Sequence, residues 1–139
     1  MANLLADTGV WYALYIKTDQ HHAKAREQAE LFELHHVILP WPVFYEVLRT
    51  KMVRNARALR LFEDHLRSMD WTELDDRPYR QAALHLCFDS ALAGSRPMSL
   101  IDCTIRLILN DRNVAVDLFM TFNARDFHDV CGDRQIQMV

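Results

Sequence analysis

The stretch at residues 3–16, NLLADTGVWYALYI, contains the pattern that decides the fold. The apolar run at 3–6 has the length of a buried strand, and the apolar and aromatic residues at 8–16 form a run of helix length. Asp7 stands between them, at the carboxyl end of the predicted strand. A strand followed directly by a helix begins a β-α unit, and such units build parallel sheets.

The same alternation of short apolar runs and longer helical patterns continues along the chain. Further strands are predicted at 36–40, 71–74 and 117–122, with an edge strand at 135–139. Helices are predicted at 19–34, 42–52, 56–69, 77–93 and 99–110, with a short helical turn at 124–130. We therefore expect one domain over residues 1–139, of the α/β class, with helices on both faces of a mostly parallel sheet of four or five strands.

The composition is that of a compact globular domain. Half of the 139 residues are apolar and only three are Gly. No apolar run reaches membrane-spanning length, and Asp7 interrupts the apolar stretch that a signal peptide would need, so we expect a cytoplasmic protein. Cys87, Cys103 and Cys131 form no Cys-x-x-Cys pair, which favours free thiols over a disulfide frame or a zinc site.

The net charge of −3 argues against a general polyanion binder, so contact with nucleic acid would need a local basic patch. The His doublets at 21–22 and 35–36 lack the spacing of metal-binding motifs and are expected to be solvated surface residues. Neither observation by itself assigns a function.

Basic residues gather in one segment: Arg49, Lys51, Arg54, Arg57 and Arg60. Their spacing predicts a helical stripe, which is either an ordinary solvated face or a surface that positions nucleic-acid phosphates. Arg96, in the loop before residue 99, is a further candidate for RNA binding. Trp11, Tyr12 and Tyr15 could stack on RNA bases, although core packing is the favoured interpretation of Trp11.

Four acidic residues lie in apolar segments close to predicted strand ends: Asp7, Glu46, Asp102 and Asp126. The carboxyl ends of parallel strands meet at one edge of the sheet, where sites form. Each acid also has an ordinary alternative. Asp7 can be the N-cap of the following helix, Glu46 a water-facing residue at a helix boundary, and Asp126 a turn residue. Asp102 follows Ser99 by three residues, as in a capping box.

Carboxylates that crowd together repel one another unless a cation or a proton compensates. Hard divalent cations such as Mg²⁺ and Mn²⁺ prefer all-oxygen ligands. A metal held in this way can activate water and stabilise displacement at a phosphodiester. Taken together, the four acids predict metal-dependent phosphoryl-transfer chemistry.

Four segments resemble the PIN-domain family, and in particular its VapC-type toxin ribonucleases. They are LLADTGVWYAL at 4–14, LPWPVFYEVLRT at 39–50, MSLIDCTIRLIL at 98–109 and MTFNARDF at 120–127. The resemblance implies a three-layer α/β/α domain that binds Mg²⁺ or Mn²⁺ and cleaves RNA endonucleolytically. It also implies a homodimer that is silenced by a cognate antitoxin protein.

By this resemblance, Asp7 and Asp102 would be the principal metal ligands. Glu46 would be a ligand directly or through water, where it could help to orient the attacking water. Asp126 completes the predicted catalytic and metal-binding set. Small polar residues are expected to steady the site: Thr8, Ser99, Thr121 and Asn123.

Asn123 is a departure from the pattern of the family, because many members carry an Asp two residues after the strand Thr. Asn offers a carbonyl ligand but no charge. A helical turn from Asn123 would place Asp126 on the same face, where it could supply that charge. Two functions therefore stay open: a metal-dependent endoribonuclease, and a catalytically impaired PIN-like module that binds RNA or protein.

Overall fold

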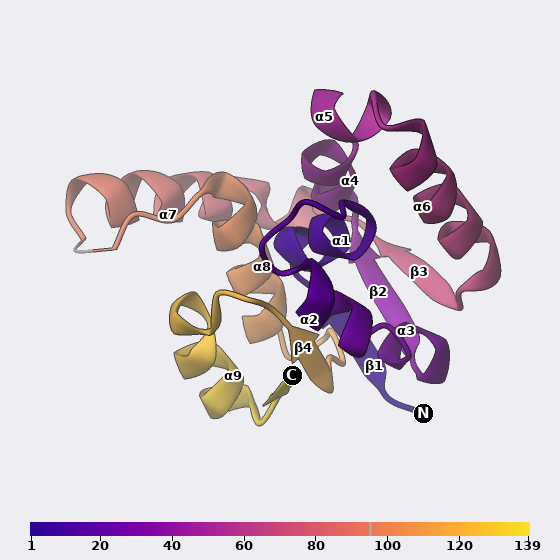
Figure 1. Ribbon diagram of the computed structural model, residues 1–139. Coiled ribbons are helices and arrows are strands. Elements are labelled where there is room, and N and C mark those ends of the chain that lie inside the picture. Colours follow the sequence, from indigo (N-terminus) through magenta and orange to yellow (C-terminus); the bar gives the residue numbers. More distant parts are fainter. Residues whose placement is uncertain (95) are drawn as a thin grey trace.

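The computed structural model describes residues 1–94 and 96–139, and within them the strands form one five-stranded parallel sheet in the order β3-β2-β1-β4-β5 (Figure 1). The strands are β1 (Asn3–Ala6), β2 (His36–Pro40), β3 (Trp71–Leu74), β4 (Leu118–Met120) and β5 (Gln137–Met138). β1 lies at the centre, where Leu5 is paired with Ile38 of β2 and with Phe119 of β4. The predicted α/β class is confirmed.

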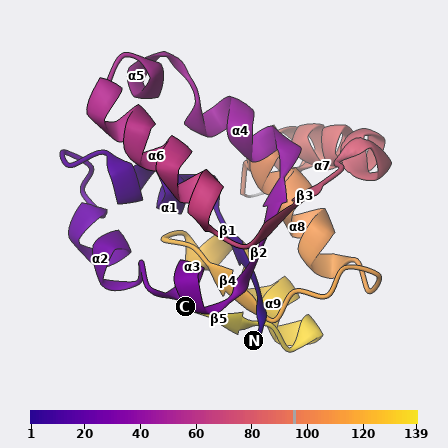
Figure 2. The same ribbon diagram turned by 90° about the vertical axis from the view of Figure 1, so that its right-hand side faces the viewer.

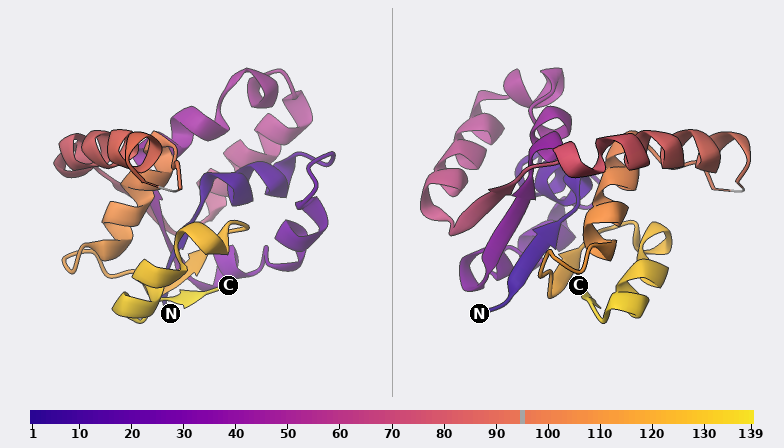
Figure 3. Two further views of the ribbon diagram at one scale, coloured as in Figure 1. Left: turned by 90° about the vertical axis from the view of Figure 1, so that its left-hand side faces the viewer. Right: turned by 180° about the vertical axis from the view of Figure 1, so that it is seen from behind.

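Helices cover both faces of this sheet, which gives three layers (Figure 2). One group is α1 (Thr8–Tyr15), α2 (His22–Glu27), α3 (Leu31–Leu34), α4 (Trp41–Val47), α5 (Thr50–Val53) and α6 (Ala56–Ser68). The other is α7 (Arg80–Leu92), α8 (Leu100–Asn110) and α9 (His128–Arg134). α7 projects away from the rest of the molecule (Figure 3).

Each face of the sheet has its own apolar core, because side chains of a strand alternate between the two faces. Leu4 and Ala6 pack on the α1 side, in a cluster that includes the fully buried ring of Trp11. Leu5 points to the other side, where Ile105 of α8 is buried. A central strand with both faces covered accounts for the unbroken apolar run at the start of the sequence.

Two predicted helices are broken in the structure. The helix predicted at 19–34 is divided into α2 and α3, and the turn between them lets Ala25 and Phe32 both reach the core beside Trp11. The helix predicted at 42–52 is divided into α4 and α5 because Arg49 is extended, with ψ 177°. Tertiary packing overrides helix propensity at both breaks.

The last part of the chain has the predicted order of elements with different bounds. The strands predicted at 117–122 and 135–139 are shortened to β4 and β5, and the turn predicted at 124–130 is a 3₁₀ turn (Ala124–Asp126) followed by α9. β4 ends at Met120 rather than at residue 122, because the Thr121 hydroxyl turns away to bond the backbone N–H of Asn123. Within the described residues no helix combines the length and the apolarity needed to cross a bilayer. Cys87, Cys103 and Cys131 are free thiols, as expected.

Candidate active site

Asp7 is fixed where β1 turns into α1, and its side chain is buried, with 8% exposed. Its backbone N–H donates to the Met120 carbonyl at 2.9 Å, which ties it to the end of β4. The Thr8 N–H donates to Asp7 Oδ1 at 2.8 Å, and the Thr121 hydroxyl donates to Oδ2 at 2.9 Å. Asp7 is thus the N-cap of α1, and both of its carboxylate oxygens are held by hydrogen bonds.

The segment after β4 brings Asn123 and Asp126 together. Asn123 donates its backbone N–H to Thr121 Oγ1 at 2.9 Å, and its side-chain amide donates to Asp126 Oδ2 at 2.5 Å. Asp126 ends the short 3₁₀ helix Ala124–Asp126 and is partly buried. The predicted helical turn is therefore present, with the two side chains in contact.

Asp102 lies in the first turn of α8 and is half-buried. Its backbone N–H donates to Ser99 Oγ at 3.2 Å, so Ser99 is the N-cap that the capping box predicts. Burial raises the pKa of the Asp102 carboxyl. Hydrogen bonds from Ser99 work against this rise, whereas the negative charges of Asp126 and Glu46 add to it. Helix capping alone does not account for two like-charged neighbours.

The acids act on one another. Burial and the charge of Asp102 raise the pKa of Asp7 to about 6, and Asp126 adds to the rise, while the bonds from Thr121 and Thr8 oppose it. Asp7, Asp102 and Asp126 therefore share one electrostatic environment at the carboxyl end of the central strands. Glu46 lies near this group but is exposed on α4, so its expected apolar surroundings are not observed.

The donor chemistry of this group suits a hard divalent cation, because the side chains are carboxylates that repel one another and no Cys or His is among them. The acids do not already converge as ligands: among the described residues, no three or more Asp, Glu, His or Cys side chains form a group that could hold a metal. Their side chains would have to change conformation to coordinate a common ion.

One predicted RNA-binding residue lies beside the acids. The Arg96 guanidinium is 3.7 Å from Asp126 Oδ1 and donates to the Arg125 carbonyl at 2.6 Å. Arg106 donates to the Asp126 carbonyl at 3.0 Å and pairs with the Asp129 carboxylate. Asp126 therefore has two guanidinium groups nearby, which partly offset the negative charge of the site.

The prediction of a single basic stripe is wrong, because its residues belong to separate elements. Arg49 and Arg54 flank α5, whereas Arg57 and Arg60 lie on α6. Arg49 and Lys51 lie over the Tyr12 ring, 5.1 and 5.6 Å from its centroid, in cation–π contact. Arg57 instead lines a pocket that α6 shares with α1 and α2.

Two further surface predictions are corrected in part. Trp11, Tyr12 and Tyr15 are 1, 8 and 4% exposed, so the core packing favoured for Trp11 is confirmed and base stacking by these three rings is not supported. The His doublets are half-buried and bonded rather than solvated. The His21 ring stacks on Phe122 with centroids 4.5 Å apart, and His22 Nδ1 is 2.7 Å from the Ala13 carbonyl oxygen.

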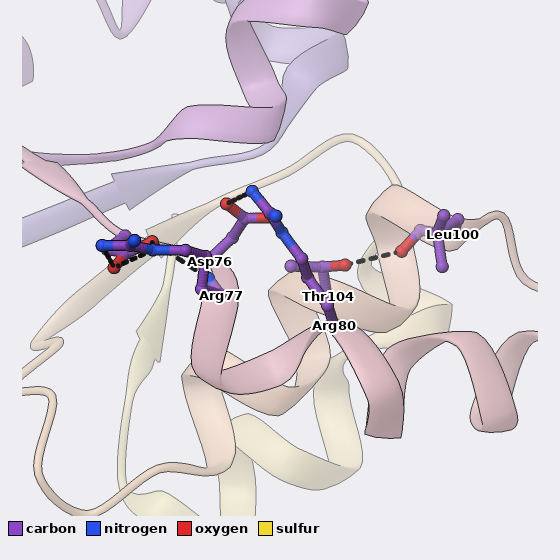
Figure 4. A network of polar contacts seen from close by, with 6 residues as sticks. Asp76, Arg77, Arg80, Leu100 and Thr104 are labelled. Atoms are coloured by element: carbon purple, nitrogen blue, oxygen red, sulfur yellow. Dashed lines mark hydrogen bonds and ion pairs between the residues drawn. The ribbon is translucent and has the colours of Figure 1, made fainter.

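Sequence reasoning missed a polar feature beside Glu46. Asp76 is 7% exposed and accepts two bonds from the Arg80 guanidinium, at 3.0 and 3.1 Å (Figure 4). Asp76 and Arg80 line a pocket of about 580 Å³ together with Glu46 and Thr104. An Asp followed by an Arg four residues later is the available sequence signal.

Comparison with known proteins gives no assignment: no family model matches the chain, and no curated protein matches it. Its function is therefore inferred from the residues themselves.

Proposed function

We propose that this protein is a Mg²⁺- or Mn²⁺-dependent endoribonuclease of the PIN-like, VapC type. The observation that supports the proposal best is the placement of Asp7, which is buried at the end of β1 and held through both carboxylate oxygens. Burial and the charges of Asp102 and Asp126 raise its pKa to about 6. Such crowding is unfavourable without a compensating charge. A divalent cation bound there would supply that charge and a water activated for attack on a phosphodiester.

The residues of the site then have distinct roles. Asp7 and Asp102 would hold the metal, with Asp7 oriented by the Thr8 N–H and the Thr121 hydroxyl. Glu46, which is exposed on α4, would orient the attacking water. Asp126 would contribute the charge that its partner Asn123 lacks.

Beside this group, Arg96 would bind a substrate phosphate. Ser99 keeps α8 capped so that Asp102 stays at the edge of the sheet.

The resemblance of the motifs supports the remaining parts of the same proposal. The protein would be the cytoplasmic toxin of a toxin–antitoxin pair, would form a homodimer, and would be silenced by a cognate antitoxin. RNA is its proposed substrate.

The test is cleavage of RNA by purified protein in Mg²⁺, Mn²⁺, Zn²⁺ or excess EDTA. We expect cleavage with Mg²⁺ or Mn²⁺ only, and its loss in Asp7→Asn and in Asp102→Asn, since Asn keeps the capping role but not the charge. Asp64→Asn, an exposed acid on α6, is the control for loss of one charge.

Cleavage that persists in EDTA would refute the metal dependence. Retained cleavage in Asp102→Asn at saturating Mg²⁺ would leave Asp102 as a helix cap only. RNA binding without cleavage under every condition would favour the impaired module, which the Asn at position 123 makes the second candidate.

A further inference from the structure

A pocket separate from the acids is lined by residues of α1, α2 and α6 and of the segments beside them. These three helices lie on one side of the sheet (Figure 2). Its volume is about 460 Å³, within the range of small-ligand sites. Lys17, Arg26 and Arg57 line it from three different segments, whereas Glu33 is its one acidic lining residue in the described chain. This excess of positive charge is notable in a chain whose net charge is −3.

The three cations are exposed, and none of them forms an ion pair with a described residue. Among the described residues, neither Lys17, Arg26 nor Arg57 has a carboxylate oxygen within 4.0 Å of its side-chain nitrogens. Other arginines, such as Arg80 and Arg106, are paired. Like charges that share a hollow repel one another, and an anion bound between them would remove the repulsion.

Part of the pocket lining is polar and hydrogen-bonded. The Tyr15 hydroxyl is hydrogen-bonded to His65 Nδ1, and His65 Nε2 is 3.7 Å from a Glu33 carboxylate oxygen. Burial lowers the pKa of His65, Glu33 works against this, and the charge of Arg26 lowers it further. The imidazole is therefore neutral at pH 7 and does not cancel Glu33, so the net charge of the lining comes from the three cations and one carboxylate.

We propose that this pocket binds a phosphate group, held by Lys17, Arg26 and Arg57. The two guanidinium groups and the ammonium group approach the pocket from three segments of the chain. Donors arranged in this way can bind several oxygens of a phosphate at once, whereas a carboxylate offers only two. The phosphate would belong either to the RNA backbone or to a small phosphorylated molecule. Only the first of these rests on the proposed function.

The position of the pocket favours RNA as the source. Asp7 and Tyr15 stand at opposite ends of α1, which at 1.5 Å per residue is about 12 Å long. The loop between α1 and α2 also returns to the acid side, where His21 stacks on Phe122, next to Thr121. A single strand that binds at the acids and continues past the end of α1 would reach the pocket.

The test uses full-length protein in EDTA, so that binding is measured without cleavage. Inorganic phosphate is titrated by NMR chemical-shift changes, and a short single-stranded RNA by fluorescence anisotropy. Arg26→Gln and Arg57→Gln remove pocket charges. Lys24→Gln on α2 and Arg60→Gln on α6 are the matched controls, because they remove the same charge from the same helices outside the pocket lining.

We expect each pocket variant to weaken phosphate binding by about tenfold and each control by less than about twofold. A parallel loss of RNA affinity would identify the RNA backbone as the source, whereas unchanged RNA affinity would identify a small phosphorylated ligand. Equal losses in pocket and control variants would overturn the proposal, as would binding of an acidic peptide but of no phosphate. Asp7→Asn should leave phosphate binding at the pocket unchanged. The phosphate titration therefore tests the pocket independently of the nuclease proposal.

Discussion

Replacing Asp7 by Asn should stabilise the fold in the absence of metal while abolishing cleavage. Asn has the same shape and can still accept the Thr8 N–H bond at the start of α1. The Thr121 hydroxyl can reverse its role and accept from the new amide. The variant therefore removes the buried charge and its repulsion with Asp102 while keeping the local hydrogen bonds.

The magnitude follows from the pKa of Asp7, which rises from 3.8 to about 6 on folding. The folded protein binds this proton more tightly than the unfolded chain, so stability falls as the pH rises between these two values. At pH values above both pKa values, the charged Asp7 lowers the free energy of unfolding by its full amount. For a shift of about two pKa units this amount is about 3 kcal/mol. When the Thr121 hydroxyl accepts from the new amide, its own proton is left without an acceptor, which costs about 1 kcal/mol and reduces the gain to about 2 kcal/mol.

The assay is thermal unfolding in EDTA at several pH values, with Asp64→Asn as the control. At neutral pH we expect Asp7→Asn to melt about 6 °C above the parent, since about 1 kcal/mol corresponds to about 3 °C for a chain of this size. The difference should shrink toward acid pH. Added Mg²⁺ should raise the melting temperature of the parent only. A variant less stable than the parent at neutral pH, or a difference independent of pH, would refute the reasoning.

Three further predictions concern other parts of the molecule. Asp126→Ala should slow cleavage and raise the Mg²⁺ concentration that cleavage requires, and adding Asn123→Asp should restore part of the lost rate. The measurement is a Mg²⁺ titration of the cleavage rate. If Asp126→Ala matches the parent in this titration, Asp126 is an ordinary turn residue. Tyr15→Phe should lower the free energy of unfolding by about 1–2 kcal/mol, because His65 loses its buried partner, and urea unfolding with no change would contradict this. Gln135→Gly should raise that free energy by about 0.5–1 kcal/mol, because Gln135 ends α9 in the left-handed region at φ 57°; an unchanged or lower denaturation midpoint would contradict this.

Local patterns predicted the strands and most helices. The central strands β1, β2 and β4 are largely buried and read as apolar runs, whereas the edge strands β3 and β5 are partly exposed. The breaks at 28–30 and 48–49 could not be predicted in this way. The segment from 19 to 34 has helix-forming residues throughout, and only packing of Phe32 against the Trp11 ring, 4.7 Å between centroids, accounts for the turn.

The candidate site was predicted in part. Parallel topology alone indicates that Asp7 lies near the residues that follow β4, since strand ends meet at one edge. Sequence spacing could not reveal that Arg57 faces Lys17 and Arg26, because these residues are brought together by tertiary packing of α2 and α6 beside α1. The residue types of Trp11, Tyr12 and Tyr15 made them possible base-stacking residues, but the packing of α1 buries all three.

Helix capping and metal binding are compatible roles for these acids. A carboxylate has about four acceptor positions, and the bonds from Thr8 and Thr121 use one on each oxygen of Asp7. About two positions therefore remain, in an orientation that the bonds fix. The N-terminus of α1 favours the charge, yet burial and the neighbouring acids still leave the pKa at about 6. The carboxylate of a helix cap does not normally have a pKa raised in this way. The cap therefore explains how Asp7 is held in place, whereas burial and the charge of Asp102 leave an unfavourable energy that the proposed cation would offset.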